Sequence, residues 1–597
     1  MSPQMPARVE PTPSAPPRAG RSPDDAGPEW SRSARRSAVL YAALLLAAIP
    51  AGIALGLNGT TFWAEIPTAI TDLGYSFTRM VAAYAMSLGF SLAYGYYAAT
   101  RRTGERVMIP VLDILQSVPI LGFFPVAIVF FIQVFGPGDW IGPNLASVFL
   151  IFTSMAWNMV FGVYESLKSI PVELREAADS FGSSGLQRMR RLVFPATINR
   201  LVYNSILSWT AGWFFLVEAE IFTTSFNQQP LAGIGSYLSF AASAGDASAF
   251  VAGIVPLVIL IIVMDFALWR PLGRLAERYR YDQTPSGEGP SESRTGATRM
   301  RRAASYVTRG VRAGVSRIGT PFAQLAAFTT RPLRRRERPR ARSAVGYLVL
   351  GVILFFVWLM VIAIGVAVFH VFSAPIPPSV QSQILSLPFA MGASLLRVVA
   401  AFAVSLAISL PLAVYLTRPS LGSRVGLPMI EVIASIPATA FFPAIIFGLV
   451  PLLGAEASSI LMLMTGMIWY LFFNLLAGLR SVPPDLAEAG RSFGLRGRSL
   501  LRRVLLPGAF AAFVTGAITA FGGGWNTLIV AEYLQVTPSQ TFQLFGVGSL
   551  LDVGFVEPHG LPLMTAALFT LVATVIAINE LLWKPLYRIA TTRYRYD

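Results

Sequence analysis

The chain contains uninterrupted apolar blocks of about 20 residues, each long enough to cross a bilayer as a helix. Examples are the blocks at 37–57, 345–369 and 561–583. Of the 597 residues, 54% are hydrophobic and 13% are charged, whereas a soluble domain carries about 25% charged residues. These features predict an integral membrane protein of the all-α class.

Lysine and arginine alternate along the chain with stretches that contain neither. The stretches without them are 58–78, 134–143, 223–250, 372–396 and 533–561, and those rich in arginine are 1–36, 100–106, 168–191, 270–342, 480–503 and 584–595. Because basic loops stay on the cytoplasmic side, both termini and the long middle segment are predicted to be cytoplasmic. The charge is spread over loops on one side, which argues against a nucleic-acid partner.

Residue types that commonly serve in catalysis or metal binding are scarce. The chain has no cysteine and two histidines, His370 and His559, so we expect neither a metal site nor a catalytic triad. No Gly-x4-Gly-Lys-Ser/Thr loop for ATP occurs. The sequence therefore predicts no enzyme activity, no metal and no cofactor in this chain.

The two halves of the chain are an internal repeat. At one constant spacing, Arg79 aligns with Arg397, and Ser117-Val118-Pro119 aligns with Ser435-Ile436-Pro437. After a short length difference, other pairs follow at a second constant spacing: Glu176/Glu488, Gly182/Gly494, Pro195/Pro507, Trp213/Trp525 and Glu220/Glu532. Both halves end in Arg-Tyr-Arg-Tyr-Asp, at 278–282 and 593–597.

Hydropathy predicts six spans in each half, about twelve in total. They lie near 37–57, 77–99, 110–133, 145–165, 197–222 and 250–270, and near 345–370, 390–416, 428–452, 458–478, 508–533 and 561–583. An even number of spans gives both halves the same orientation, so they are parallel repeats about an axis along the membrane normal. Residues 1–36 are expected to be a disordered tail, and 300–328 are either a basic amphipathic helix on lipid or part of a disordered linker.

Between the fourth and fifth spans, each half carries a loop with the features of a short exposed helix. Ser169 and Ser481 are residues typical of N-caps, and each is followed by proline suited to a first turn. Small residues would leave a shallow face that another protein can approach. The residues of interest are Glu176, Ala177, Ala178 and Gly182 in the first loop, and Glu488, Ala489, Gly490 and Gly494 in the second.

Glu-Ala-Ala, three residues, Gly and then a proline at the next span resembles the "EAA" loop of ABC importer permeases. The Ser-x-Pro…Phe-Phe-Pro, Trp…Ala-Glu and Gly-x-Gly patterns resemble the nitrate/sulfonate/taurine branch. The departure is Gly490, where the family has alanine, and a glycine there weakens a helix by roughly 0.5–1 kcal/mol. The resemblance implies a first permease domain at 37–282, a basic linker at 283–343 and a second permease domain at 344–597.

The same resemblance implies partners and a mechanism. The loops would be coupling helices for two copies of a separate ATPase subunit, which would bind ATP and Mg. An extracytoplasmic solute-binding protein would deliver a small anion. The two halves, in contact with membrane lipid, would alternate access in a bacterial inner membrane. The alternative is a secondary transporter of the major facilitator type, which also has six plus six spans but has no use for the repeated loop.

Several residues in the spans are candidates for the solute pathway or its gate: Arg79, Trp157, Asn158, Trp213, Glu220, Arg397, Trp469, Trp525, Asn526 and Glu532. Glu220 and Glu532 each lie 25 residues after the proline that opens span five, about 37 Å along a helix. That places them at the depth of Arg79 and Arg397, near the outer boundary. Either each arginine pairs with a glutamate, or the arginines extend to lipid headgroups and the glutamates face water. Attraction of an anionic solute to the arginines is a third possibility.

Overall fold

Long helices account for most of the structure, which is a computed structural model. It describes residues 58–117, 119–135, 140–181, 187, 189–226, 231–277, 376–417, 421–537, 540–557 and 560–593. All of them belong to one compact unit of the chain. The predicted tail (1–36), the spans at 37–57 and 345–370, the linker and both histidines lie outside these residues.

The first half consists of helices along its whole described length. They are α2 (Gly59–Thr100), α3 (Arg102–Ser117), α4 (Ile120–Phe135), α5 (Ile141–Lys168), α6 (Val172–Ser180), a π-helical turn at Met189–Val193, α8 (Phe194–Phe226), α9 (Ile234–Ser243), α10 (Ala247–Met264), a second π-helical turn at Asp265–Trp269, and α11 (Arg270–Glu277). The first of them begins where the Asn58 side chain accepts a hydrogen bond from the Thr60 N–H, which caps the helix.

The second half repeats this order. It contains α14 (Pro378–Thr417), α15 (Leu421–Ser435), a 3₁₀ turn at Ala438–Phe441, α16 (Phe442–Leu453), α17 (Ala455–Ser481), α18 (Pro484–Ser492), α19 (Arg498–Leu500), a π turn at Leu501–Leu505, α20 (Leu506–Gly508), α21 (Phe510–Glu532), β1 (Tyr533–Thr537), β2 (Gln540–Gln543), α22 (Val547–Val556), α23 (Leu561–Ile578), a π turn at Asn579–Trp583, and α24 (Lys584–Arg593). Even the π turns recur at equivalent places, so the repeat found in the sequence extends to local irregularities of the backbone.

Six of the described helices are long and apolar enough to cross a membrane, or seven if a bent pair counts as one span. The all-α class is confirmed, and some helices are longer than the predicted spans: α14 starts twelve residues before the predicted 390. One short exception is the antiparallel ribbon of β1 and β2, with Tyr533 opposite Gln543. Its Tyr, Val, Thr and Phe side chains favour a strand, and hydropathy alone does not reveal that preference.

The third span of each half is not the continuous helix that the sequence predicted. In the second half, α15 ends at Ser435 and the helix resumes at Ala438, with a bend of 76° between the two parts. Proline has no N–H to donate, and it disfavours helical backbone in the residue before it. The Ser-x-Pro motif at 435–437 is therefore the break, and α3 and α4 are separated at the equivalent Pro119.

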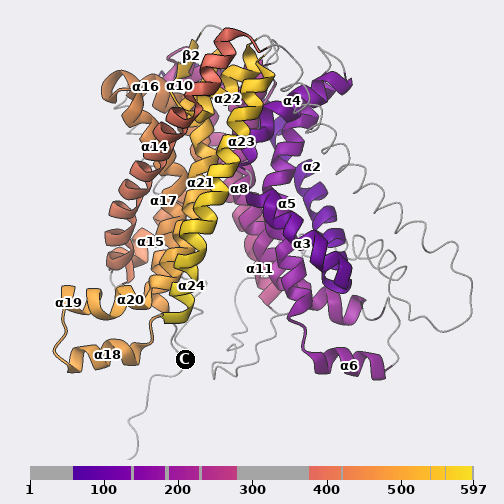
Figure 1. The fold of residues 1–597 in the computed structure, drawn as a ribbon, viewed down its shortest axis with the longest axis vertical. Coiled ribbons are helices and arrows are strands. Elements are labelled where there is room, and N and C mark those ends of the chain that lie inside the picture. Colours follow the sequence, from indigo (N-terminus) through magenta and orange to yellow (C-terminus); the bar gives the residue numbers. More distant parts are fainter. Residues whose placement is uncertain are drawn as a thin grey trace, which may run out of the picture. The chain divides into compact units, whose positions relative to one another are not determined.

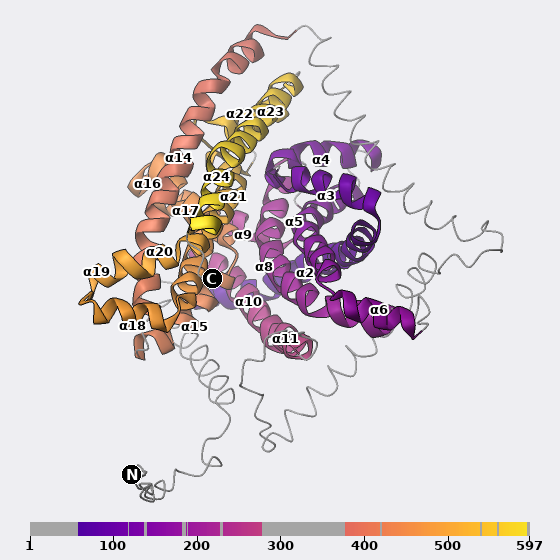
Figure 2. The ribbon, with the colours of Figure 1, turned by 60° about the horizontal axis from the view of Figure 1, so that its bottom comes forward.

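The two halves contact each other through equivalent elements. At the start of α4, the Ile120 N–H donates to the Asn526 Oδ1 of α21 at 2.7 Å. At the matching place in the other half, the Thr439 hydroxyl donates to the backbone oxygen of Phe214 on α8 at 3.0 Å. Figures 1 and 2 show that α6 and α18 project from the same end of the structure, which is what parallel repeats require.

Candidate functional site

A buried ion pair joins α2, α8 and the start of α9 in the first half. The carboxylate of Glu220 is fully buried and accepts from Arg79 Nη1 at 2.6 Å, from the Ser76 hydroxyl at 2.7 Å, and from the Gly235 N–H at 2.8 Å. The Ser76 hydroxyl in turn accepts from the Ile234 N–H at 2.8 Å. Arginine therefore neutralises a charge that would be very unfavourable alone in this interior.

The second half builds the same site from equivalent residues. The carboxylate of Glu532 accepts from Arg397 Nη1 at 2.6 Å, from the Ser394 hydroxyl at 2.6 Å and from the Gly548 N–H at 2.9 Å. The Val547 N–H donates to the Ser394 hydroxyl at 2.9 Å. Of the two arrangements left open by the sequence, the structure has the ion pairs, at 2.6 Å in both halves. Their role at a gate remains a prediction.

The serine of each site had no role in the sequence analysis, and the Gly-x-Gly motif served there only as a family pattern. Ser76 and Ser394 each lie three residues before the arginine, at equivalent positions of the repeat, and this was the signal that could have identified them. The first glycine of each Gly-x-Gly motif lies directly over the carboxylate, so a Cβ on Gly233 or Gly546 would overlap the carboxyl group of Glu220 or Glu532. These glycines are needed for close approach and not for a left-handed turn, since both have extended backbone, with φ of 171° at Gly233 and −179° at Gly546.

We expect Gly546→Ala to lower the free energy of unfolding by about 1–3 kcal/mol, because the added methyl group must displace the Glu532 carboxylate from its donors. Thermal unfolding of the purified full chain in detergent measures this. Gly392→Ala on α14 is the matched control, because a Cβ there meets nothing within 4 Å and alanine favours the helix by about 0.5–1 kcal/mol. Equal unfolding temperatures for the two variants would contradict the proposed close approach.

The two sites differ in the second partner of the arginine. Arg79 donates from Nε to the Asn144 side chain at 2.7 Å and from Nη2 to the Ala232 oxygen at 2.7 Å. Arg397 instead makes a two-pronged contact with the carboxylate of Glu456, at 2.7 and 2.6 Å. The Glu456 side chain is 62% exposed. The second half therefore has one more negatively charged residue at this site than the first half, which has Asn144 in that position.

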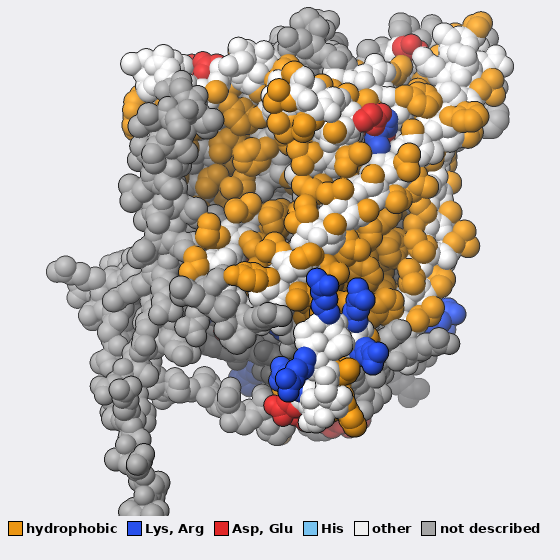
Figure 3. Space-filling view, turned by 90° about the vertical axis from the view of Figure 1, so that its left-hand side faces the viewer, with side chains coloured by type: hydrophobic (Ala, Val, Ile, Leu, Met, Phe, Trp, Pro, Cys, Tyr) orange, Lys and Arg blue, Asp and Glu red, His pale blue; other side chains and the backbone are white. Residues whose placement is uncertain are grey.

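The loops identified from the EAA pattern form α6 and α18, which are nine residues each. Glu176, Ala177, Glu488 and Ala489 are exposed, and Ala178 is half-buried. Gly182 lies outside the described residues. Figure 3, which views the face that carries α18 and α19, shows Lys and Arg side chains gathered at this end, below a mainly hydrophobic surface.

The structure corrects one expectation for these helices. Ser169 and Ser481 are not N-caps: they end the preceding helices, and their hydroxyls donate to the Ser166 and Gly478 oxygens. Proline does start α18, with Pro483 at the N-cap and Pro484 at N1. Gly494 follows the C-cap of α18, and its φ of +80° favours glycine, as is common after the end of a helix.

Gly490 does not offer a docking face. It is buried, and a Cβ there would lie 2.9 Å from the Leu500 Cδ1 atom and 3.1 Å from the Val504 Cγ2 atom. The second loop folds back through α19 onto α18, and glycine allows that close packing. Packing against Leu500 and Val504 thus explains why glycine stands at position 490, where the family has alanine.

An exposed phenylalanine follows each short helix. Phe181 is 87% exposed and Phe493 is 85% exposed, at equivalent positions of the repeat. Aromatic residues are enriched in the cores of protein interfaces, so these two matched, exposed rings are candidates for contact with another protein. The sequence analysis passed over both residues, although each directly precedes the glycine of the motif.

Two of the predicted pathway tryptophans are core residues. Trp213 is 1% exposed and Trp525 is 3% exposed, and both belong to the main hydrophobic core. Trp213 packs against Trp209 with ring centroids 6.3 Å apart. Neither offers a surface to a solute in this conformation.

The remaining pathway candidates occupy different environments. Trp157 and Trp469 are half-buried, and the ring of Trp157 lies 6.4 Å from that of Phe90. Asn158 is exposed, and Asn526 accepts the bond from the first half described above. The structure does not bring these four residues together into one site.

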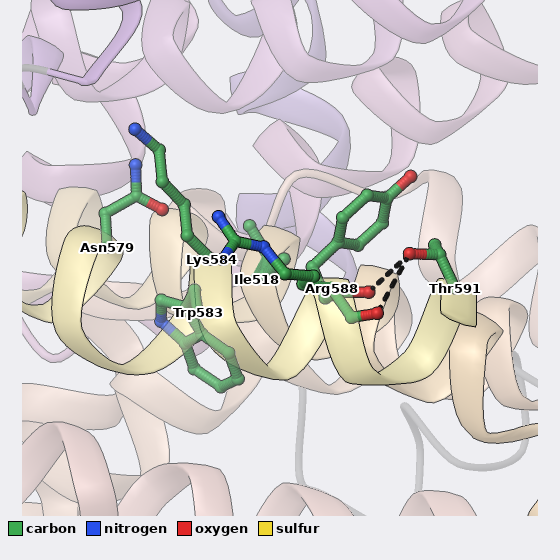
Figure 4. A pocket seen from close by; sticks show the side chains of 7 residues that line it. Ile518, Asn579, Trp583, Lys584, Arg588 and Thr591 are labelled. Atoms are coloured by element: carbon green, nitrogen blue, oxygen red, sulfur yellow. Dashed lines mark hydrogen bonds between the residues drawn. The ribbon is translucent and has the colours of Figure 1, made fainter. Parts of the chain in front are cut away.

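A cavity of about 500 Å³ lies along α24, lined by Ile518, Asn579, Trp583, Lys584, Tyr587, Arg588 and Thr591. Apart from Ile518, which belongs to α21, these side chains lie along one helical stretch (Figure 4). The Thr591 hydroxyl donates to the Tyr587 and Arg588 backbone oxygens at 2.9 and 3.2 Å. All the lining residues come from the second half.

Parallel helical repeats, each with a short exposed helix at one end and a buried ion pair near the other, define a membrane transport protein. Two segments, 85–268 and 405–581, match the family model "Binding-protein-dependent transport system inner membrane component", and together they make up more than half of the chain. The chain belongs to this family. It is a permease of the ABC importer class with two permease domains fused in tandem, and the family consists of transport subunits rather than enzymes.

Individual relatives are more distant. The chain is 28% identical to the taurine transport system permease protein TauC of Escherichia coli, over 27% of this chain and 58% of TauC. It is 33% identical to the putative aliphatic sulfonates transport permease protein SsuC of the same organism, over 19% of this chain and 42% of SsuC. It is 21% identical to the nitrate import permease protein NrtB of Leptolyngbya laminosa, over 31% and 61%. The matches span about half of the length of these relatives.

Proposed function

We propose that this chain forms the complete solute pathway of an importer and couples it to ATP hydrolysis by two copies of a separate ATPase. The observation that carries the proposal is the pair of short exposed helices, α6 and α18, at one end of the structure. Each would insert into one ATPase subunit, with Phe181 or Phe493 as its apolar anchor. ATP and Mg would be bound by the ATPase, and an extracytoplasmic solute-binding protein would deliver the solute.

The solute that we propose is a small anion of the nitrate, sulfonate or taurine type. Three relatives are named for taurine, aliphatic sulfonates and nitrate, which share a compact group of negatively charged oxygen atoms. Both arginines near the outer boundary are fully engaged with glutamates, so they are not free to attract an anion. Selection would therefore rest mainly with the binding protein.

Reconstitution of the chain with its ATPase and binding protein in liposomes tests this function. Uptake of taurine, an alkyl sulfonate or nitrate should require ATP on the side of the membrane that carries the ATPase. It should stop with an ATPase variant that cannot hydrolyse ATP. Uptake by the chain alone, driven by a proton or sodium gradient, would instead identify a secondary transporter. Ligand binding by the isolated binding protein identifies the solute directly.

A further inference from the structure

Two buried carboxyl groups take no part in the ion pairs described above. Glu218 on α8 and Asp552 on α22 are both 0% exposed. None of their four carboxyl oxygen atoms has a hydrogen-bond partner, and within the described ranges these are the two acidic side chains whose buried oxygens are unpartnered. They lie in opposite halves of the repeat, their helices both pack against β1, and Asp552 is within electrostatic reach of Glu218.

The surroundings of the two groups offer no free positive charge among the described residues. Asp552 also interacts with Glu532 and with the phenol of Tyr533 on β1. The arginines on the neighbouring helices α2 and α14 are committed, Arg79 to Glu220 and Arg397 to Glu532 and Glu456. An isolated carboxylate in such an interior is so unfavourable that the group neutralises by taking up a proton.

The pair occurs once, although the fold is repeated. Glu218 and Val530 each lie two residues before the paired glutamate, and Asp552 and Ser239 each lie six residues after the first glycine of the Gly-x-Gly motif. The equivalent site thus holds valine and serine. The fold accepts a neutral pair at the equivalent site, so packing does not explain why the first site has two acidic residues.

We propose that Glu218 and Asp552 form a proton-binding site between the two halves, with at least one of the two carboxyl groups protonated in this conformation. β1 of the second half packs against α8 and α9 of the first half and also against α22, and so closes the site. If the halves separate there, water enters, a carboxyl O–H bond breaks, and the proton leaves to water as the carboxylate forms. Proton release would then accompany the rearrangement, independently of which solute is carried.

Infrared difference spectroscopy on the purified full chain in lipid nanodiscs tests this site. At pH 7 the wild type should show a protonated-carboxyl C=O band that shifts in D₂O, weakened in Glu218→Gln or Asp552→Asn and lost in the double variant. Glu488→Gln, on the exposed face of α18, is the control and should leave the band unchanged. No difference between the wild type and the double variant would overturn the proposal.

A second measurement covers the case in which those variants fold poorly. Glu218→Val with Asp552→Ser copies the neutral pair of the equivalent site, so it should fold. A proton that is bound only in the folded state stabilises the fold less as pH rises. Between pH 6 and 9, the unfolding temperature of the wild type should therefore fall more steeply than that of this variant. Equal slopes would contradict the proposal. So would a wild-type rise in unfolding temperature when Na⁺ replaces K⁺ at constant ionic strength, since that would identify a metal cation.

Discussion

Replacing Arg79 by methionine is expected to lower the free energy of unfolding by about 3–5 kcal/mol, because it leaves the Glu220 carboxylate buried without a counter-charge. Glu220 is fully buried, and Arg79 is 5% exposed. The Ser76 and Gly235 donors remain, but two neutral hydrogen bonds do not replace a cation in a water-free interior. The equivalent change, Arg397→Met, should have a comparable effect through Glu532.

An exposed ion pair in the same protein is the matched control. Arg200 and Glu165 are 2.8 Å apart, but their side chains are 48% and 56% exposed, so Arg200→Met should cost at most about 1 kcal/mol. Unfolding of both variants in the same detergent gives the comparison. A loss for Arg79→Met no larger than that for Arg200→Met would show that the buried pair does not stabilise the fold as we expect.

Adding Glu220→Gln to Arg79→Met should restore part of the loss, because it removes the uncompensated charge. A charge swap should not. With Arg79→Glu and Glu220→Arg, the guanidinium would face the N–H of Gly235 and the hydroxyl donor of Ser76, and it would have no room beneath Gly233. The site is built around a carboxylate at position 220, so the two charges are not interchangeable.

The Arg–Glu clusters show which features of the site could be predicted from the sequence. The depth of Arg79 and Glu220 followed from helix rise and the position of Pro195, and the two residues are indeed paired. Apolar blocks and proline spacing act locally, so spans and exposed helices could be predicted. The serine and glycine that complete each cluster come from segments more than 100 residues apart, and no local pattern gives that proximity.

Other expectations failed for reasons that the structure makes clear. Ser169 and Ser481 look like caps, but the preceding helices continue through this region, so their hydroxyls bond backward. Trp213 and Trp525 were expected along a pathway and instead fill the core. Helical periodicity does not distinguish a face that packs from a face that lines a passage, because the distinction depends on the neighbouring helices.

Replacing Phe181 and Phe493 by alanine together is expected to abolish ATP-driven uptake while the chain still folds. Both rings are more than 80% exposed, so their loss removes little internal packing. A buried aromatic anchor at an interface contributes at least about 2 kcal/mol, a factor of about 30 in affinity. Each single variant should therefore weaken ATPase binding by about that factor, and the double variant should do so by more.

The control for this experiment is an exposed aromatic residue at the other end of a helix. Trp140, at the start of α5, is 74% exposed, and Trp140→Ala should leave ATPase binding unchanged because α6 follows the opposite end of α5. Binding of the ATPase to the chain in nanodiscs and uptake in liposomes are measured for all variants, with thermal unfolding to verify the fold. If the double variant binds the ATPase as tightly as Trp140→Ala, the phenylalanines are not the anchors, and docking must rest on the exposed Glu176 and Glu488 faces instead.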